Sequence, residues 1–136
     1  MSNPKGVSSL GDLIDQLQAW ALRWSLLEDE WDLASPFTPE NRLMPKDIIE
    51  VGGLALAIRE ALAGDQSEHA VEWRMMAATL EERAEEAMDA AAKWSMDQVS
   101  SKALIAAVQN AQREAQVLVD SYVAVNGPPK WPGRVH

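Results

Sequence analysis

Three pairs of acidic residues have the spacing of a metal-binding helix face. The members of each pair lie three residues apart, so they share one face of a helix. The pairs are Asp47 with Glu50, Glu82 with Glu85, and Glu86 with Asp89. Carboxylates on two facing helices can hold Mg²⁺ against a phosphate chain, which makes these residues a candidate magnesium site. Acid-rich helix faces are also common as solvated surfaces, and that second interpretation stays open.

Four helices are predicted to position these side chains. Apolar residues recur at alternating spacings of three and four in each segment, which is typical of amphipathic helices. The first helix follows Ser9 and runs for about 24 residues, and the others cover residues 46–63, 67–98 and 101–126. Residues 35–45 contain three prolines and form a loop between the first two helices. The predicted fold class is all-α, an antiparallel four-helix bundle.

One domain is predicted, followed by a short tail. A length of 136 residues with 47% hydrophobic residues fits a single core. Asn126, Gly127 and two prolines end the last helix, so the domain covers residues 1–127 and an extended Pro-rich tail covers residues 128–136. Trp131 lies in this tail, where its ring can fold back onto the bundle or contact a partner.

The location expected from composition is cytoplasmic. The chain has no cysteine, so it forms no disulfide and has no thiolate chemistry. The N-terminal residues lack the apolar segment of a secretory signal. No run of 18 apolar residues occurs, so we expect no membrane contact.

The charge is acidic and unevenly distributed. The formal net charge is −9, with −11 in residues 1–98 and +2 in residues 99–136. Acidic proteins are repelled by nucleic acid, which is therefore disfavoured as a direct ligand. The basic residues toward the C-terminus leave open a helical subunit of a nucleoprotein complex. These residues are Lys93, Lys102, Arg113, Lys130 and Arg134.

Two sequence runs carry a resemblance to a known enzyme family. They are LQAWALRW and, after the proline loop, TPENRLMPKDIIEVGGLALAIREAL. Together they resemble the opening of MazG-like all-α nucleoside triphosphate pyrophosphohydrolases. That family carries a pattern close to E-E-V-G-E-L-A-x-A-I and a later E-x-x-D, and both acidic pairs bind magnesium. By this resemblance Glu50 matches the first ligand, Gly53 stands at the second, and Glu86 with Asp89 matches the later motif. The resemblance implies a magnesium cofactor and an essential Glu50.

The glycines at 52 and 53 need a separate explanation. Each costs about 1 kcal/mol inside a helix relative to alanine. We interpret them as allowing a tryptophan to lie against the helix backbone. Gly53 is then a packing position, and Gly53→Glu would bury a carboxylate. A tight hairpin between the second and third helices would also place Glu50 opposite Glu81.

The function favoured by these patterns is a non-enzymatic, acidic helical module that acts by protein–protein contact. It would be a small subunit of a larger assembly, or an inhibitor or immunity-type protein. Acidic faces attract basic partners over long range. The expected partner-binding residues are Glu81, Glu82, Glu85, Glu86 and Trp131. No cofactor is expected for such a module, and self-association is compatible with it. The alternatives are a MazG-like magnesium-dependent hydrolase, active or inactive, and a helical nucleoprotein subunit.

Overall fold

The computed structural model describes residues 9–31 and 44–127, with side chains for residues 9–24, 46–100 and 102–127. The described residues form four helices and no strand, which confirms the all-α prediction. The helices are α1 (Leu10–Trp31), α2 (Met44–Ala61), α3 (Glu68–Ser95) and α4 (Ser101–Asn126). Residues 35–43 of the predicted Pro-rich loop and the tail with Trp131 lie outside the described residues.

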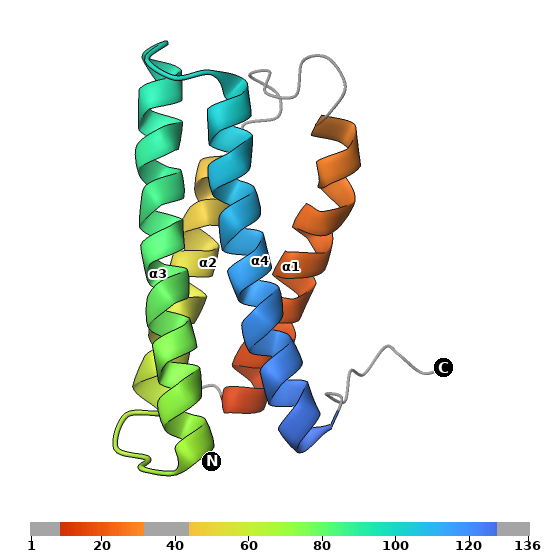
Figure 1. The fold of residues 1–136 in the computed structure, drawn as a ribbon, viewed down its shortest axis with the longest axis vertical. Coiled ribbons are helices and arrows are strands. Elements are labelled where there is room, and N and C mark those ends of the chain that lie inside the picture. Colours follow the sequence, from red (N-terminus) through yellow and green to blue (C-terminus); the bar gives the residue numbers. More distant parts are fainter. Residues whose placement is uncertain (1–8, 32–43, 128–136) are drawn as a thin grey trace.

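The helices form a four-cornered bundle. Each packs against two main neighbours: α1 and α3 both contact α2 and α4. Successive helices run in opposite directions, as the colour gradient of Figure 1 shows. Figure 1 also places the end of α4 beside the start of α1. As a result, α2 contributes one face to the core and leaves its opposite face on the outside of the bundle.

The core is built from the apolar stripes that the sequence predicts. Trp20, Trp24 and Trp73 are buried, and so are the alanines that line the inner face of α3. The indole Nε1–H of Trp20 donates to the Asp47 carbonyl at 2.9 Å, which ties α1 to the first turn of α2. Buried Gln112 on α4 donates through Nε2 to the Ala21 carbonyl of α1 at 3.1 Å. Two polar contacts therefore fix α1 against both neighbours.

Local signals explain where the helices begin and end. Ser9, Ser67 and Ser100 each accept a backbone N–H of the following helix through their hydroxyl groups, as helix N-caps do. Three predicted boundaries are wrong by two or three residues, and one of them is the end of α2, which lies at Ala61 rather than residue 63. α2 begins at Met44, because Pro45 lacks only an N–H that the first turn does not use. α3 ends at Ser95 rather than residue 98, since Asp97 adopts a left-handed φ of 61° and stops the helix.

No described helix has the length and apolar character of a membrane-crossing segment.

Candidate functional site

Asp47 and Glu50 lie together on α2, and both contact a cation from α1. Arg23 Nη2 lies 3.3 Å from Asp47 Oδ1 and 3.1 Å from Glu50 Oε1. The Asp47 side chain is 16% exposed, whereas that of Glu50 is 45% exposed. Burial raises the pKa of Asp47, and the Arg23 guanidinium partly offsets this effect. The two carboxylates therefore point toward α1 and share a fixed positive charge.

Three acidic residues of α3 lie on its outer side, away from α2. Ala84 is the residue that faces α2, because a Cβ built on Gly52 would lie 3.5 Å from Ala84 Cβ. Each residue turns about 100° around a helix, so side chains two positions away from Ala84 point away from α2. Glu82 and Glu86 occupy these positions, and Asp89 lies on the same outer side. Both Glu82 and Glu86 are more than half exposed.

The predicted register between α2 and α3 is wrong. The predicted pairing of Glu50 with Glu81 would place Thr79 at the level of Gly52, but Ala84 lies there, five residues further along α3 and therefore more than one helical turn away. The cause is the connection between the helices, which continues past the end of α2 before α3 begins. Arg74, well inside α3, is the residue that donates to the carbonyls of Leu62 and Asp65, at 2.6 and 2.7 Å.

The two halves of the predicted magnesium site are therefore held apart. Asp47 and Glu50 point toward α1, while Glu86 and Asp89 point away from α2 on α3. Glu82 also points away from α2, and Glu85 borders the groove beside Gly52 and Gly53. Among the side chains that the structure describes, no group of three or more acidic or histidine residues is close enough to hold a metal ion.

Most acidic side chains on α3 have a basic neighbour. Glu81 accepts two hydrogen bonds from Arg59 of α2, which raise the pKa of Arg59. Arg83 lies 3.6 Å from Glu82 and 2.6 Å from Glu86. Lys93 pairs with Asp89 at 3.0 Å. Glu85 is exposed, and it differs from these residues because it has no ion pair within the described part of the chain.

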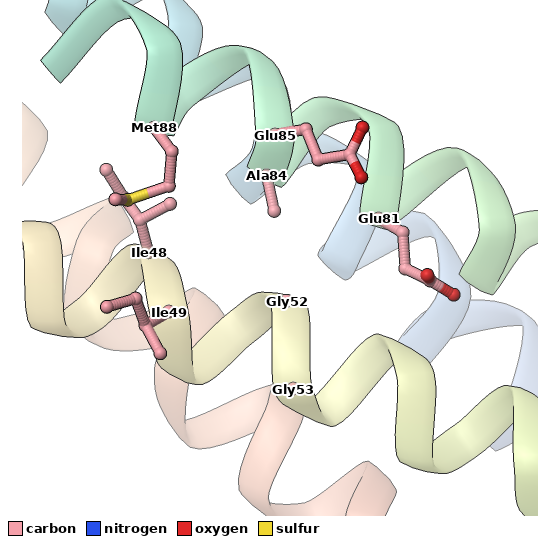
Figure 2. A pocket seen from close by; sticks show the side chains of 8 residues that line it. All are labelled: Ile48, Ile49, Gly52, Gly53, Glu81, Ala84, Glu85 and Met88. Carbon is pink, nitrogen blue, oxygen red and sulfur yellow. The ribbon is translucent and has the colours of Figure 1, made fainter. Parts of the chain in front are cut away.

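A groove of about 320 Å³ lies between α2 and α3. Figure 2 shows its two ends: Ile48, Ile49 and Met88 lie at one end, and Glu81 and Glu85 at the other. Between these ends, the floor is formed by Gly52, Gly53 and Ala84. The groove thus combines an apolar end, an acidic end and a floor that lacks large side chains.

The predicted role of the two glycines in tryptophan packing is wrong. The residue next to Gly52 is Ala84, and a Cβ on Gly53 would meet no atom of another described element within 4 Å. Gly53 is exposed, so Gly53→Glu would place its carboxylate in solvent rather than bury it. The 3-4 periodicity of α2 already places Gly53 outside the apolar stripe and so predicts that it is exposed. For this position, periodicity is a better guide than the general association of glycine with close packing.

Several interacting residues were not predicted from the sequence. Arg23 and Arg59 bind acidic residues of other helices, and sequence spacing along one helix carries no information on such partners. Ile49 and Leu56 are 62% and 41% exposed, and their positions outside the 3-4 stripe of α2 would have revealed this. Of the basic residues near the C-terminus, Lys102 and Arg113 are exposed on α4, whereas Lys130 and Arg134 lie outside the described ranges.

Comparison with known protein families gave no matching family model, and comparisons with curated proteins and with solved structures gave no significant match.

Proposed function

We propose that the protein acts by contact with another protein that presents a basic surface, and that the outer side of α3 is the contact surface. The observation that carries this proposal is the exposed acid on that helix. Between residues 81 and 89, α3 contains five acidic residues and one arginine. Glu82, Glu85 and Glu86 are the exposed members nearest this arginine, and we refer to these three residues as the acidic face.

The ion pairs between Arg83 and the acidic face are weak enough for a basic side chain of a partner to replace Arg83. Exposed pairs such as Arg83 with Glu82 and Glu86 typically contribute only about 0–1 kcal/mol. A basic side chain from a partner can therefore replace Arg83 at little cost. A partner can bind Glu85 without displacing a basic side chain, because Glu85 has no ion pair in the described part of the chain. Its carboxylate borders the acidic end of the groove, as Figure 2 shows.

The biological role that fits this surface is a small subunit of an assembly, or an inhibitor or immunity-type protein, in the cytoplasm. Long-range attraction between an acidic face and a basic partner accelerates association and disfavours acidic competitors. Such a role requires no cofactor and no catalytic group.

Capture of the partner with matched variants tests the proposal. The wild type is compared with Glu82→Lys/Glu85→Lys/Glu86→Lys in extracts of the source cells, and captured proteins are identified by mass spectrometry. The control is Glu72→Lys/Glu114→Lys/Asp120→Lys, which changes the net charge equally at positions outside the acidic face, on the first part of α3 and on α4. We expect a basic partner that the wild type and the control retain and the acidic-face variant loses. Equal capture by all three proteins would contradict the proposal.

A magnesium-dependent nucleoside triphosphate hydrolase is the alternative proposal. One observation supports it: Asp47 and Glu50 already hold a cation between them, the Arg23 guanidinium. The test is magnesium-dependent release of pyrophosphate from a panel of nucleoside triphosphates, with Glu50→Gln as the control. Turnover by the wild type that Glu50→Gln abolishes would support this alternative. The absence of turnover with every triphosphate would remove it.

A further inference from the structure

We propose that a second copy of this chain packs antiparallel against the exposed face of α2, in a symmetric dimer whose two helices cross at Gly53. The surface involved consists of residues spaced by three or four, so they form one line along the helix. We refer to this line as the dimer stripe: Lys46, Ile49, Gly53, Leu56 and Glu60. All five residues are exposed in the single chain.

Two members of the stripe are large apolar residues that the single chain leaves in solvent. Ile49 is 62% exposed and Leu56 is 41% exposed, and they are the two large apolar residues left in solvent among the described side chains of α2, residues 46–61. They flank Gly53 on either side, and Ile49 also forms part of the apolar end of the groove. Burying both side chains against another protein surface would be favourable.

Gly53 makes no close contact with another helix in the described part of the chain. No described atom of another element lies within 4 Å of a Cβ built at this position, so a side chain would have space there. Glycine in a helix interior is destabilising, and its usual benefit is the close approach of another backbone. In a two-fold symmetric antiparallel pair, the residue on the axis meets its own copy. Glycine at that position allows the closest approach of the two helices.

The order of residues along the stripe selects the antiparallel arrangement. Lys46 lies seven residues before Gly53, and Glu60 lies seven residues after it. Antiparallel crossing at Gly53 therefore brings Lys46 of each copy to Glu60 of the other. Neither residue has an ion pair in the described part of the chain, so both are available. A parallel pair would instead place lysine against lysine and glutamate against glutamate.

The apolar residues match in the same arrangement. Ile49 lies four residues before Gly53 and Leu56 lies three residues after it. In the antiparallel pair, Ile49 of each chain therefore contacts Leu56 of the other chain. Both side chains also lie on the side of Gly53 that is turned toward α3, since Gly52 on that side faces Ala84. A two-fold axis perpendicular to the helices places the Ile49 and Leu56 side chains of the second copy on this same side of the helix pair. Leu56 of the second copy then covers the apolar end of the groove.

The dimer goes beyond the proposed function and does not depend on it. Glu82 and Glu86 point away from α2, so the dimer leaves them accessible. A dimer would present two acidic faces to a partner, and two linked contacts can strengthen binding without any new interaction.

Sedimentation equilibrium and cysteine crosslinking test the dimer. The wild type is expected at twice the chain mass of 15.0 kDa. The chain has no cysteine, so Gly53→Cys introduces a single thiol at the two-fold axis, where two Cβ atoms can come close enough for a disulfide. Rapid formation of a disulfide dimer is expected for Gly53→Cys. It is not expected for Val117→Cys, an equally simple variant at an exposed position on α4.

Charge reversal gives an independent test that does not alter the crossing point. Lys46→Glu or Glu60→Lys alone should weaken the dimer about tenfold, since each change places like charges together at both ends of the stripe. The double variant should restore dimerisation, and circular dichroism checks that all variants stay helical. A monomer at every soluble concentration, equal crosslinking at positions 53 and 117, or a failure of the double variant to restore the dimer would each overturn the proposal.

Discussion

Gly52 lies in the middle of α2 at a position where a side chain has room. A Cβ there would lie 3.5 Å from Ala84 Cβ, which is an ordinary van der Waals contact. Gly52→Ala should therefore raise the free energy of unfolding by about 1 kcal/mol, because alanine favours the helix. Urea denaturation measures this change. The matched control is Gly64→Ala, where a φ of +88° strains any side chain and should lower stability by about 1 kcal/mol. A loss of stability in Gly52→Ala would mean that the helices cannot accept the methyl group.

Asp65 makes stability depend on pH in a defined direction. The Ser67 backbone N–H donates to Asp65 Oδ1 at 2.9 Å, and this hydrogen bond lowers the pKa of Asp65. A lowered carboxylate pKa stabilises the folded state above the pKa of the unfolded chain, and the contribution is lost as the pH falls through the folded pKa. Asp65→Asn should therefore have a lower melting temperature than the wild type at pH 7, with a smaller difference at pH 3. A difference that is constant with pH would contradict this assignment.

Individual residues differ in how well their roles follow from the sequence. Ser9, Ser67 and Gly64 act on backbone groups within a few positions, so their roles as caps and stop could be predicted. Arg23 could not be assigned in this way, because its partners Asp47 and Glu50 belong to another helix. Such pairs depend on how two helices are aligned, and that alignment is not encoded in the residues next to Arg23.

At the scale of helices, two indole groups connect neighbouring helices with different degrees of burial. Trp20 is 1% exposed and donates to the Asp47 carbonyl at 2.9 Å. Trp73 is 7% exposed and donates to Ser121 Oγ, also at 2.9 Å, beside the Tyr122 ring. The first contact is closed to solvent on the tryptophan side, whereas the half-buried Ser121 hydroxyl can turn to water.

We therefore expect Trp20→Phe to destabilise the protein more than Trp73→Phe. Trp20→Phe removes the hydrogen bond of a fully buried indole and leaves a space in the core, with a loss of about 2–3 kcal/mol. Trp73→Phe should lose about 1 kcal/mol, since water can replace the indole at Ser121. Chemical denaturation of both variants under the same conditions measures the two losses. Equal losses, or a larger loss for Trp73→Phe, would show that the burial of the donor does not determine its contribution.

The number and type of helices were predictable, but their alignment was not. Each apolar stripe has a 3-4 spacing that identifies a helix and its core face, and Leu17, Val51, Leu80 and Leu118 are buried as expected. The register of α2 against α3 depends on residues 62–67, which carry the chain past the end of α2. Hydrogen bonds from Arg74 to Leu62 and Asp65 secure that path. These long-range contacts determine which acidic residues meet, so the predicted site could not be assembled correctly from spacing alone.

At the scale of the whole molecule, the distribution of charge supports a role in protein contact. The net charge of −9 includes a dense group of acids on α3, most of which lies on its outer side. Long-range attraction of this kind changes association rates more than dissociation rates. It also weakens as salt is added, because the Debye length falls from about 30 Å at 0.01 M to about 10 Å at 0.1 M ionic strength.

The most direct test is the association rate constant for the captured basic partner, measured at 0.01 M and 0.1 M ionic strength. For the wild type and the Glu72→Lys/Glu114→Lys/Asp120→Lys control, we predict that association slows about tenfold or more over this range, while dissociation changes less. The Glu82→Lys/Glu85→Lys/Glu86→Lys variant should associate slowly at both salt concentrations and remain folded, because exposed charges contribute little to stability. Association rates that are insensitive to salt, or equal for the acidic-face variant and the wild type, would contradict the proposal that this face recruits the partner.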